Sequence, residues 1–256
     1  MTNINCKFII DGEEWKPCHI ERLEYERNLH ILHQMKQHGI EIKDGDKILT
    51  HDDIDYLTAS EAWRVSNSVR ASYSGNEMAK FYSDSFKKSD DMWKELDFKQ
   101  DKPMKVSKCH LSVSGLSMQE FMGIMAKMQR DENILIGAHP EHFTTIVTET
   151  DIVGIEPFGM YGKPTLVKVN MADVSELGDQ IQNDRLPDYP IALTGKAYLI
   201  DGVTEINVPL HQLKPTADGF EAALAVYWPE GVPDELVTGH SLHLAMEFYQ
   251  GLKTFM

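Results

Sequence analysis

Residues 236–255, LVTGHSLHLAMEFYQGLKTF, predict one long helix late in the sequence, and this helix decides the fold. Its polar positions form one narrow stripe at about 100° per residue, made up of His243, Glu247, Gln250 and Thr254. Most of the remaining circumference is apolar, namely Leu242, Leu244, Ala245, Met246, Phe248, Leu252 and Phe255. Because a solvent-facing helix would have a broader polar face, we expect this helix to be substantially buried, with its stripe bordering a polar cavity.

The sequence before this helix predicts an antiparallel sheet. Residues 106–113, VSKCHLSV, alternate as a strand that has Cys109, Leu111 and Val113 on one face and His110 on the other. Further β-rich segments are residues 143–150, 165–169, 197–200, 205–213 and 220–228. The turn-forming sequence KPTADG separates the last two of these, which predicts a hairpin.

The first hundred residues are polar and predict mainly helices, over residues 19–38, 60–72 and 76–96. A capping-box pattern at residues 117–120 predicts the start of another helix. We therefore predict an α+β fold, with an N-terminal mainly helical subdomain (residues 1–102) and a second domain (residues 103–256). The first predicted helix contains four histidines, and its flanking Glu, Arg and Gln residues favour a solvated face over a metal cluster: His19, His30, His33 and His38.

Composition argues against several classes of function. The 256-residue chain has a net charge of −15, which is unfavourable for binding nucleic acid or an anionic membrane surface. No segment reaches the roughly eighteen apolar residues that a transmembrane helix needs, and the N-terminal apolar run is too short for a signal peptide. Three cysteines form neither an even disulfide framework nor a CxxC pair. We predict a cytoplasmic protein that acts on a small molecule and binds neither nucleic acid nor membrane.

Three places in the sequence hold residues able to ligate a metal. His243 and Glu247 lie four residues apart on the final helix, a spacing that also suits an ion pair or a hydrogen bond. Residues 139–142, HPEH, bring three potential ligands together, although the same residues suit a polar turn. His110 lies on the polar face of its strand, where a lone histidine ordinarily makes a hydrogen bond. Each place alone is therefore weak evidence for a metal.

The joint order of these residues resembles one enzyme family. Residues 110–121, HLSVSGLSMQEF, resemble the start of the catalytic region in phloretin hydrolase and 2,4-diacetylphloroglucinol hydrolase. In that family a motif with a ligand glutamate and a His-x-x-x-Glu pair on the C-terminal helix follow in the same order. The resemblance covers residues 103–256 and implies a helix-grip (Bet v 1-like) fold, in which a curved antiparallel sheet wraps a long helix around a cavity. It implies four metal ligands: His110, Glu141, His243 and Glu247.

Two imidazoles and two carboxylates suit a divalent ion, and zinc is favoured among Mn, Fe, Co, Ni and Zn. The sequence departs from the family in two respects. The helix that continues through FMGIM, residues 121–125, lacks the family's tryptophans, and the PEDH-like motif is shortened to residues 140–142. The metal site and the substrate are therefore separate predictions, and the sequence restricts the substrate less than it restricts the metal site.

The resemblance implies hydrolysis of a carbon–carbon bond next to a ketone, of the retro-Claisen type, in an acylphloroglucinol or a β-diketone. The leaving carbon must be protonated as it departs, and the candidate donors are His142, His211 and Tyr161. Several aromatic residues are candidates either for a substrate pocket or for ordinary core packing: Phe121, Phe158, Tyr161, Tyr227 and Trp228.

Two other functions fit the same sequence. One is a non-catalytic helix-grip protein that binds an apolar small ligand without a metal. The other is a metal enzyme of the same fold with different chemistry, such as isomerisation, hydration or dioxygen insertion. The N-terminal helices also offer an interface for a homodimer.

Overall fold

The structure is a computed structural model that describes residues 4–128, 131–147, 151–159 and 163–253. The fold is mixed α+β, and its largest element is an antiparallel sheet of nine strands within the described residues. In sheet order these are β2 (Glu13–Trp15), β1 (Asn5–Ile10), β5 (Met104–Ser114), β11 (Gly219–Pro229), β10 (Glu205–Pro215), β9 (Ile191–Leu199), β8 (Thr165–Met171), β7 (Asp151–Glu156) and β6 (Thr144–Val147).

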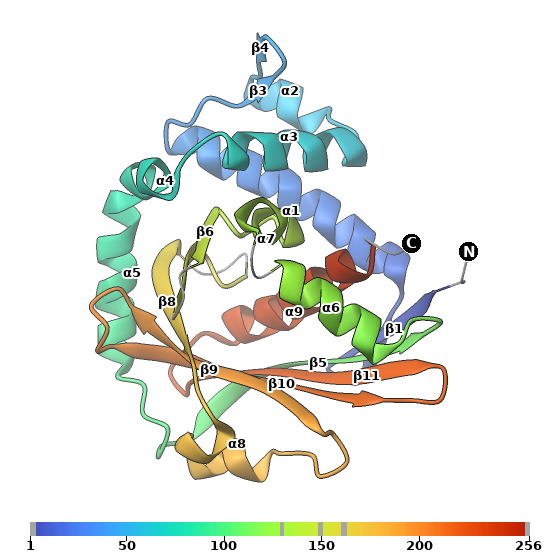
Figure 1. Ribbon diagram of the computed structural model, residues 1–256. Helices are drawn as coiled ribbons and strands as arrows, with labels where there is room; N and C mark the ends of the chain where they lie inside the picture. The colour runs from blue at the N-terminus through green and yellow to red at the C-terminus, as the bar shows by residue number, and fades with distance from the viewer. Residues whose placement is uncertain (1–3, 129–130, 148–150, 160–162, 254–256) are drawn as a thin grey trace.

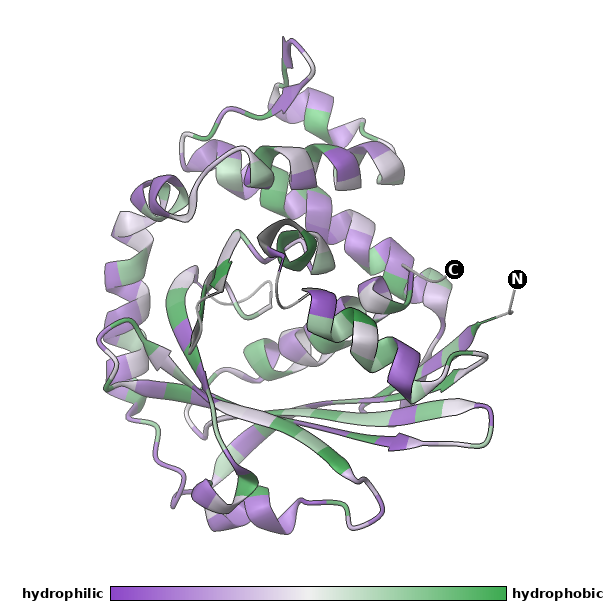
Figure 2. Ribbon diagram, viewed as in Figure 1, coloured by the Kyte–Doolittle hydropathy of each residue, from purple (hydrophilic) through white to green (hydrophobic). Residues whose placement is uncertain are grey.

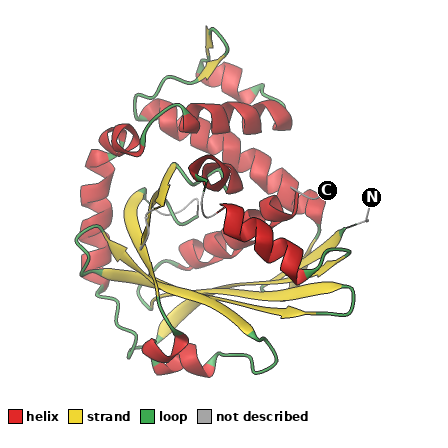
Figure 3. Cartoon of the chain, viewed as in Figure 1, coloured by secondary structure: helices red, strands yellow, loops and turns green. Residues whose placement is uncertain are grey.

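Most helices lie on one side of this sheet, which we call the inner face (Figures 1 and 3). The long helix α9 (Asp234–Lys253) packs against β5, and α1 (Pro17–Gln37), α6 (Met118–Met128) and α7 (Glu132–Ala138) contact α9. The short helix α8 (Asp179–Asn183) covers the outer face. The remaining helical elements are α2 (His51–Asp55), α3 (Ala59–Ala71), α4 (Gly75–Phe81), α5 (Ser83–Leu96) and η1 (Val174–Glu176), and β3 (Lys43–Asp44) pairs with β4 (Lys47–Ile48).

Strand alternation divides the core between the two faces, as the alternating colours of the strands in Figure 2 illustrate. On β5, Cys109, Leu111 and Val113 point to the inner face and belong to the same apolar cluster as Leu244 of α9. On the outer face a second apolar cluster joins Ile181 of α8 to the sheet. The polar residue His243 is only 2% exposed, so α9 is buried on its polar side as well.

The structure confirms most of the predicted elements. The final helix, the first helix and strand β5 lie within a few residues of their predicted bounds. The helix predicted over residues 76–96 is two helices, because the chain leaves the α conformation at Tyr82. β1 and β2 were not predicted, and β1 pairs with β5, so residues before 103 contribute to the same sheet. The two-domain division stays a prediction. Within the described residues, no helix combines the length and the apolar character needed to cross a membrane.

Gly219 gives a test of the β5–β11 pairing. A Cβ atom at this position would lie 2.0 Å from the carbonyl oxygen of Val113, which belongs to the backbone of β5. We expect Gly219→Ala to lower the free energy of unfolding by about 2 kcal/mol, since the strands must separate locally. Gly123→Ala is the control, because Gly123 has open space around its Cα in an exposed part of α6. Urea denaturation measures both; equal stability of the two variants would contradict the pairing.

Candidate metal site and the adjoining cavity

Three histidines from two distant parts of the chain meet beneath α1. His139 and His142 lie in the loop between α7 and β6, and His243 lies in the middle of α9. One ligand atom of each lies within 4.8 Å of the others, so the three could hold a metal ion. His139 and His243 are buried, and the side chain of His142 is 12% exposed. Imidazole nitrogens gathered away from bulk water are the donor set that zinc and similar divalent ions prefer.

Hydrogen bonds fix the orientation of two of these rings. Nδ1 of His142 lies 3.0 Å from the carbonyl oxygen of Leu135, so this nitrogen donates. Nδ1 of His243 lies 3.1 Å from Oε2 of Glu141 and donates to that carboxylate. In a neutral imidazole whose Nδ1 carries the proton, Nε2 keeps a free lone pair. A backbone carbonyl or a carboxylate behind the ring is the usual arrangement for a metal-ligating histidine.

The third ring, His139, has a different hydrogen bond. The backbone N–H of Glu141 donates to Nδ1 of His139 over 3.0 Å, which places the proton of the neutral ring on Nε2. This Nε2 is buried and has no hydrogen-bond partner in the described part of the protein. The ring stacks on His243 with centroids 3.6 Å apart. To ligate a metal through Nε2, His139 would have to give up the hydrogen bond from Glu141.

Glu141 connects the histidine cluster to α1 and to the segment after β7 through hydrogen bonds of its carboxylate. Its Oε1 accepts from the buried guanidinium of Arg27 on α1. Its Oε2 accepts from Nδ1 of His243 and from the backbone N–H of Gly159, the latter over 2.8 Å. Gly159 has φ +92°, and a Cβ there would lie 2.9 Å from the backbone of Gly239 on α9, so glycine is required. Glu141 was predicted as a metal ligand; both of its oxygens accept from protein groups, and through Oε2 it orients the ring of His243.

A second buried arginine holds the loop that carries the histidines. Nη1 of Arg70 on α3 donates to the carbonyl oxygens of Ile136, His139 and His142, each over 2.7 Å. Arg70 is 1% exposed, and burial lowers its pKa to about 9. These carbonyls lie at and just after the C-terminus of α7, where backbone oxygens lack helical partners and attract a cation. The guanidinium therefore takes the place of a missing helix cap.

Beside the cluster lies a cavity of about 260 Å³ between the inner face of the sheet and α9. Two acidic residues border it, Glu156 at the end of β7 and Glu247 one turn after His243. Oε2 of Glu156 lies 3.4 Å from Nε2 of His142. Burial raises the pKa of Glu247 to about 7 and raises the pKa of Glu156 well above its usual range. No lysine or arginine is among the described residues that border the cavity, so neither carboxyl has a cationic partner there.

His110, the fourth ligand that the resemblance implies, does not belong to this cluster. It lies on the outer face of β5, because its neighbours Cys109 and Leu111 occupy the inner face. Its Nε2 lies 3.0 Å from the hydroxyl of Tyr189, which in turn donates to Glu221. The sheet separates His110 from His243, so the two cannot share an ion.

The other predicted site residues are also divided. His211 and Phe158 border the cavity, whereas Tyr161 lies outside the described residues. Phe121 stacks on Phe220 and Phe248 in the core. Trp228 packs against Trp93 and Phe158 in the core, and the hydroxyl of Tyr227 donates to Asp184 on the outer face. Sequence analysis missed four residues at the site: Arg27, Arg70, Glu156 and His240.

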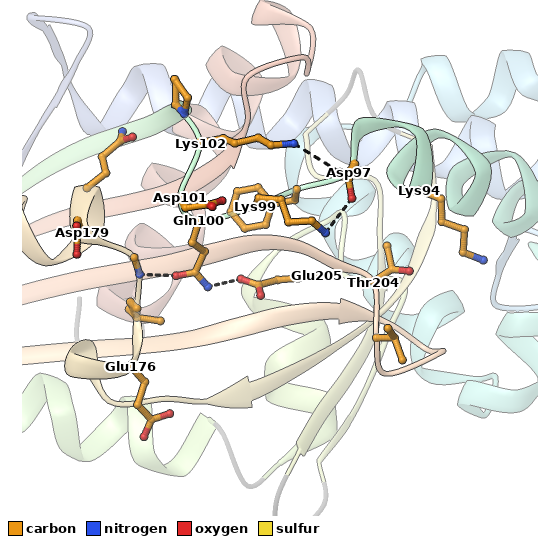
Figure 4. Close-up of a pocket in the computed structure, with 16 residues that line it drawn as sticks. Lys94, Asp97, Lys99, Gln100, Asp101, Lys102, Glu176, Asp179, Thr204 and Glu205 are labelled. Atoms are coloured by element: carbon orange, nitrogen blue, oxygen red, sulfur yellow. Dashed lines mark hydrogen bonds and ion pairs between the residues drawn. The ribbon is translucent and has the colours of Figure 1, made fainter.

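A depression of about 1070 Å³ lies elsewhere (Figure 4). Most of its charged side chains are exposed, and several are paired. Asp97 pairs with Lys99 and Lys102, and the side chain of Gln100 bridges Glu205 and the backbone N–H of Gly178. It holds no group of histidines or cysteines comparable to the histidine cluster among its described lining residues, so we place the chemistry at that cluster.

The chain matches no model of a known protein family, and it has no significant match among curated proteins.

Arg70 tests whether the histidine loop depends on α3. Arg70→Met leaves three buried carbonyl oxygens without their donor, so we expect the free energy of unfolding to fall by about 3 kcal/mol. Arg64→Met is the matched control, since Arg64 lies on the same helix and pairs with Asp44 at the exposed surface. We expect the free energy of unfolding to fall less in Arg64→Met than in Arg70→Met, because an exposed ion pair contributes little. Guanidinium denaturation measures both variants, and similar losses would contradict the role given to Arg70.

Stability of the metal-free protein should fall as the pH falls from 7 to 5. Burial lowers the pKa of His142 and of His211 to about 4, so the folded protein binds fewer protons than the unfolded chain between about pH 4 and 6.5. The stabilisation is complete above pH 6.5 and is lost toward pH 4. Glu247 and Glu156, whose pKa values burial raises, act in the opposite direction, but they are two groups against five, because burial also lowers the pKa values of His139, His240 and His243. We expect a net loss of about 2 kcal/mol in urea denaturation at pH 5; unchanged or greater stability at pH 5 would contradict this.

Proposed function

We propose that the protein is a metal-dependent hydrolase that cleaves a carbon–carbon bond next to a ketone in a small substrate. The observation that supports a metal ion most strongly is the convergence of His142 and His243 at the wall of the cavity, with Nδ1 of each ring bound to an acceptor behind it. The reaction class comes from the resemblance to phloretin and diacetylphloroglucinol hydrolases. The long buried helix on one face of an antiparallel sheet supports a helix-grip architecture.

The residues at the cavity fit a divalent cation. Glu156 and Glu247 are only partly exposed, and no lysine or arginine borders the described cavity, so a bound cation would compensate these carboxylates. We assign His142 and His243, two members of the histidine cluster, as ligands, and propose Glu247, which borders the same cavity, as the third member of a His₂Glu set of the kind that catalytic zinc sites use. His139 packs behind His243, and Glu141 orients the ring of His243. Zinc suits these donors best, although other first-row divalent metals share the preference.

The protein residues have separate tasks in this reaction. A metal ion at the site would polarise the ketone and lower the pKa of a bound water. Glu156, whose pKa is raised, is able to hold a proton close to His142 and deliver it to the leaving carbon. The apolar walls, including Phe158 and Val226, exclude bulk water from the substrate. His211 is neutral because burial lowers its pKa to about 4, so it is better suited to hydrogen bonding than to donating a proton.

Metal analysis of matched variants tests the site. We expect purified protein to contain about one metal ion per chain and His243→Ala to lose it, because the ligand and the partner of Glu141 disappear together. His110→Ala is the control and should keep its metal, since His110 lies on the outer face. The measurement is elemental analysis by plasma mass spectrometry, with circular dichroism to verify folding. A metal-free wild type would contradict the proposal, and so would loss of metal from His110→Ala alone.

The reaction class has its own test. Metal-loaded protein is incubated with acylphloroglucinols and β-diketones, and the products are identified by mass spectrometry. We expect a carboxylic acid together with the deacylated ring or ketone. A hydrated, isomerised or oxygenated product would support different metal chemistry in the same site. Tight binding without turnover by metal-free protein would support the binding-protein alternative.

A further inference from the structure

The cavity is the size of one aromatic ring. Its volume is about 260 Å³, and an apolar cavity of roughly 150 Å³ is enough to bind benzene. Apolar side chains from β8, β9, β11 and α9 form much of its wall, among them Val167, Ala197, Val226 and Leu244. A substituted six-membered ring therefore fits, whereas a ligand with two rings would have to extend beyond the described walls.

Charge restricts which rings can enter. Two acidic residues, Glu156 and Glu247, and no lysine or arginine are among the described residues that border the cavity. A carboxylate brought into such a place loses its water and gains no counter-ion from the protein, which is strongly unfavourable. Burial lowers the pKa of His211 to about 4, so this imidazole is neutral and offers no positive charge either.

Two imidazoles at the cavity have hydrogen-bonding capacity that the protein does not use. His211 comes from β10 and His240 from α9, and Nδ1 of each is buried without a partner among the described residues. Ring packing holds both in place. His211 lies edge-on to Phe248 with centroids 5.7 Å apart, and His240 stacks on His243 at 4.7 Å. Buried polar groups are nearly always satisfied, so an unsatisfied pair beside a cavity points to a ligand that completes them.

We propose that this cavity binds a ring-sized molecule without negative charge, and that His211 and His240 hydrogen-bond to its hydroxyl or carbonyl group. The proposal deepens the proposed function, because it takes the cavity to be the substrate pocket of the same metal site. In the metal-free protein it disfavours aromatic carboxylates and admits neutral phenols and aryl ketones. Since a neutral imidazole both donates and accepts, either a carbonyl or a hydroxyl can be bound.

Three ligands of one shape test the proposal. Acetophenone, benzoate and α-methylstyrene have nearly the same size, but they present a ketone, a carboxylate and an apolar alkene. Calorimetric titration uses the full chain treated with a chelator, so that a metal cannot attract benzoate. We expect acetophenone to bind at least about tenfold more tightly than either of the others, the order of one buried hydrogen bond or more. Equal or tighter binding of benzoate would overturn the proposal.

Variants of His211 then test whether this side chain recognises the ligand. His211→Leu should reduce the preference for acetophenone over α-methylstyrene at least about fivefold, whereas His211→Gln, which can still hydrogen-bond, should keep most of it. His19→Leu, at an exposed position on α1, is the control. An unchanged preference in His211→Leu would overturn the role of His211, and the three-ligand comparison on the wild type decides the charge rule even if that variant does not fold. None of these measurements requires metal or turnover, so they can succeed where the hydrolase proposal fails.

Discussion

The buried carboxylate of Glu141 is the interaction on which the rest of the site depends. It joins four segments that are far apart in the sequence: α1 through Arg27, the histidine loop, the segment after β7 through Gly159, and α9 through His243. An ion pair shielded from water is costly to form unless every oxygen is satisfied, and removing one partner costs about 3–5 kcal/mol. Arg27 on α1 supplies the cation that compensates Glu141. Because Glu141 in turn binds His243, this ion pair helps the polar stripe of α9 to be buried. In this way the N-terminal helices become part of the site.

Periodicity was enough to predict the helices and several strands, because 3.6-residue and two-residue repeats arise from local geometry. The same two-residue alternation also predicts the face of the sheet on which His110 lies. Because Cys109, Leu111 and Val113 point to the core, His110 points away from α9, although its spacing from the other predicted ligands resembles that of the family. β1 escaped prediction because a six-residue strand near the start of the chain has no distinctive signal before its partner is known.

The buried arginines were harder to foresee. Arg27 lies on the same side of α1 as the buried residues Ile20 and Ile31, so a charge within an apolar stripe was a visible signal. Its partner was not, since Glu141 is 114 residues away. Arg70 binds the backbone carbonyls of the histidine loop, and no sequence pattern reveals such partners. The residues of the HPEH motif were identified from sequence, but their tasks depend on which nitrogen each ring turns toward the backbone.

We propose above all that a metal ion binds between His142 and His243 on the inner side of the sheet. The most direct measurement is anomalous X-ray diffraction from crystals soaked in zinc and recorded on both sides of the zinc absorption edge. The account predicts a single strong anomalous peak about 2.0–2.1 Å from an imidazole nitrogen of each of these two histidines. A peak at His110 and Tyr189 on the outer face, with none at His243, would contradict it.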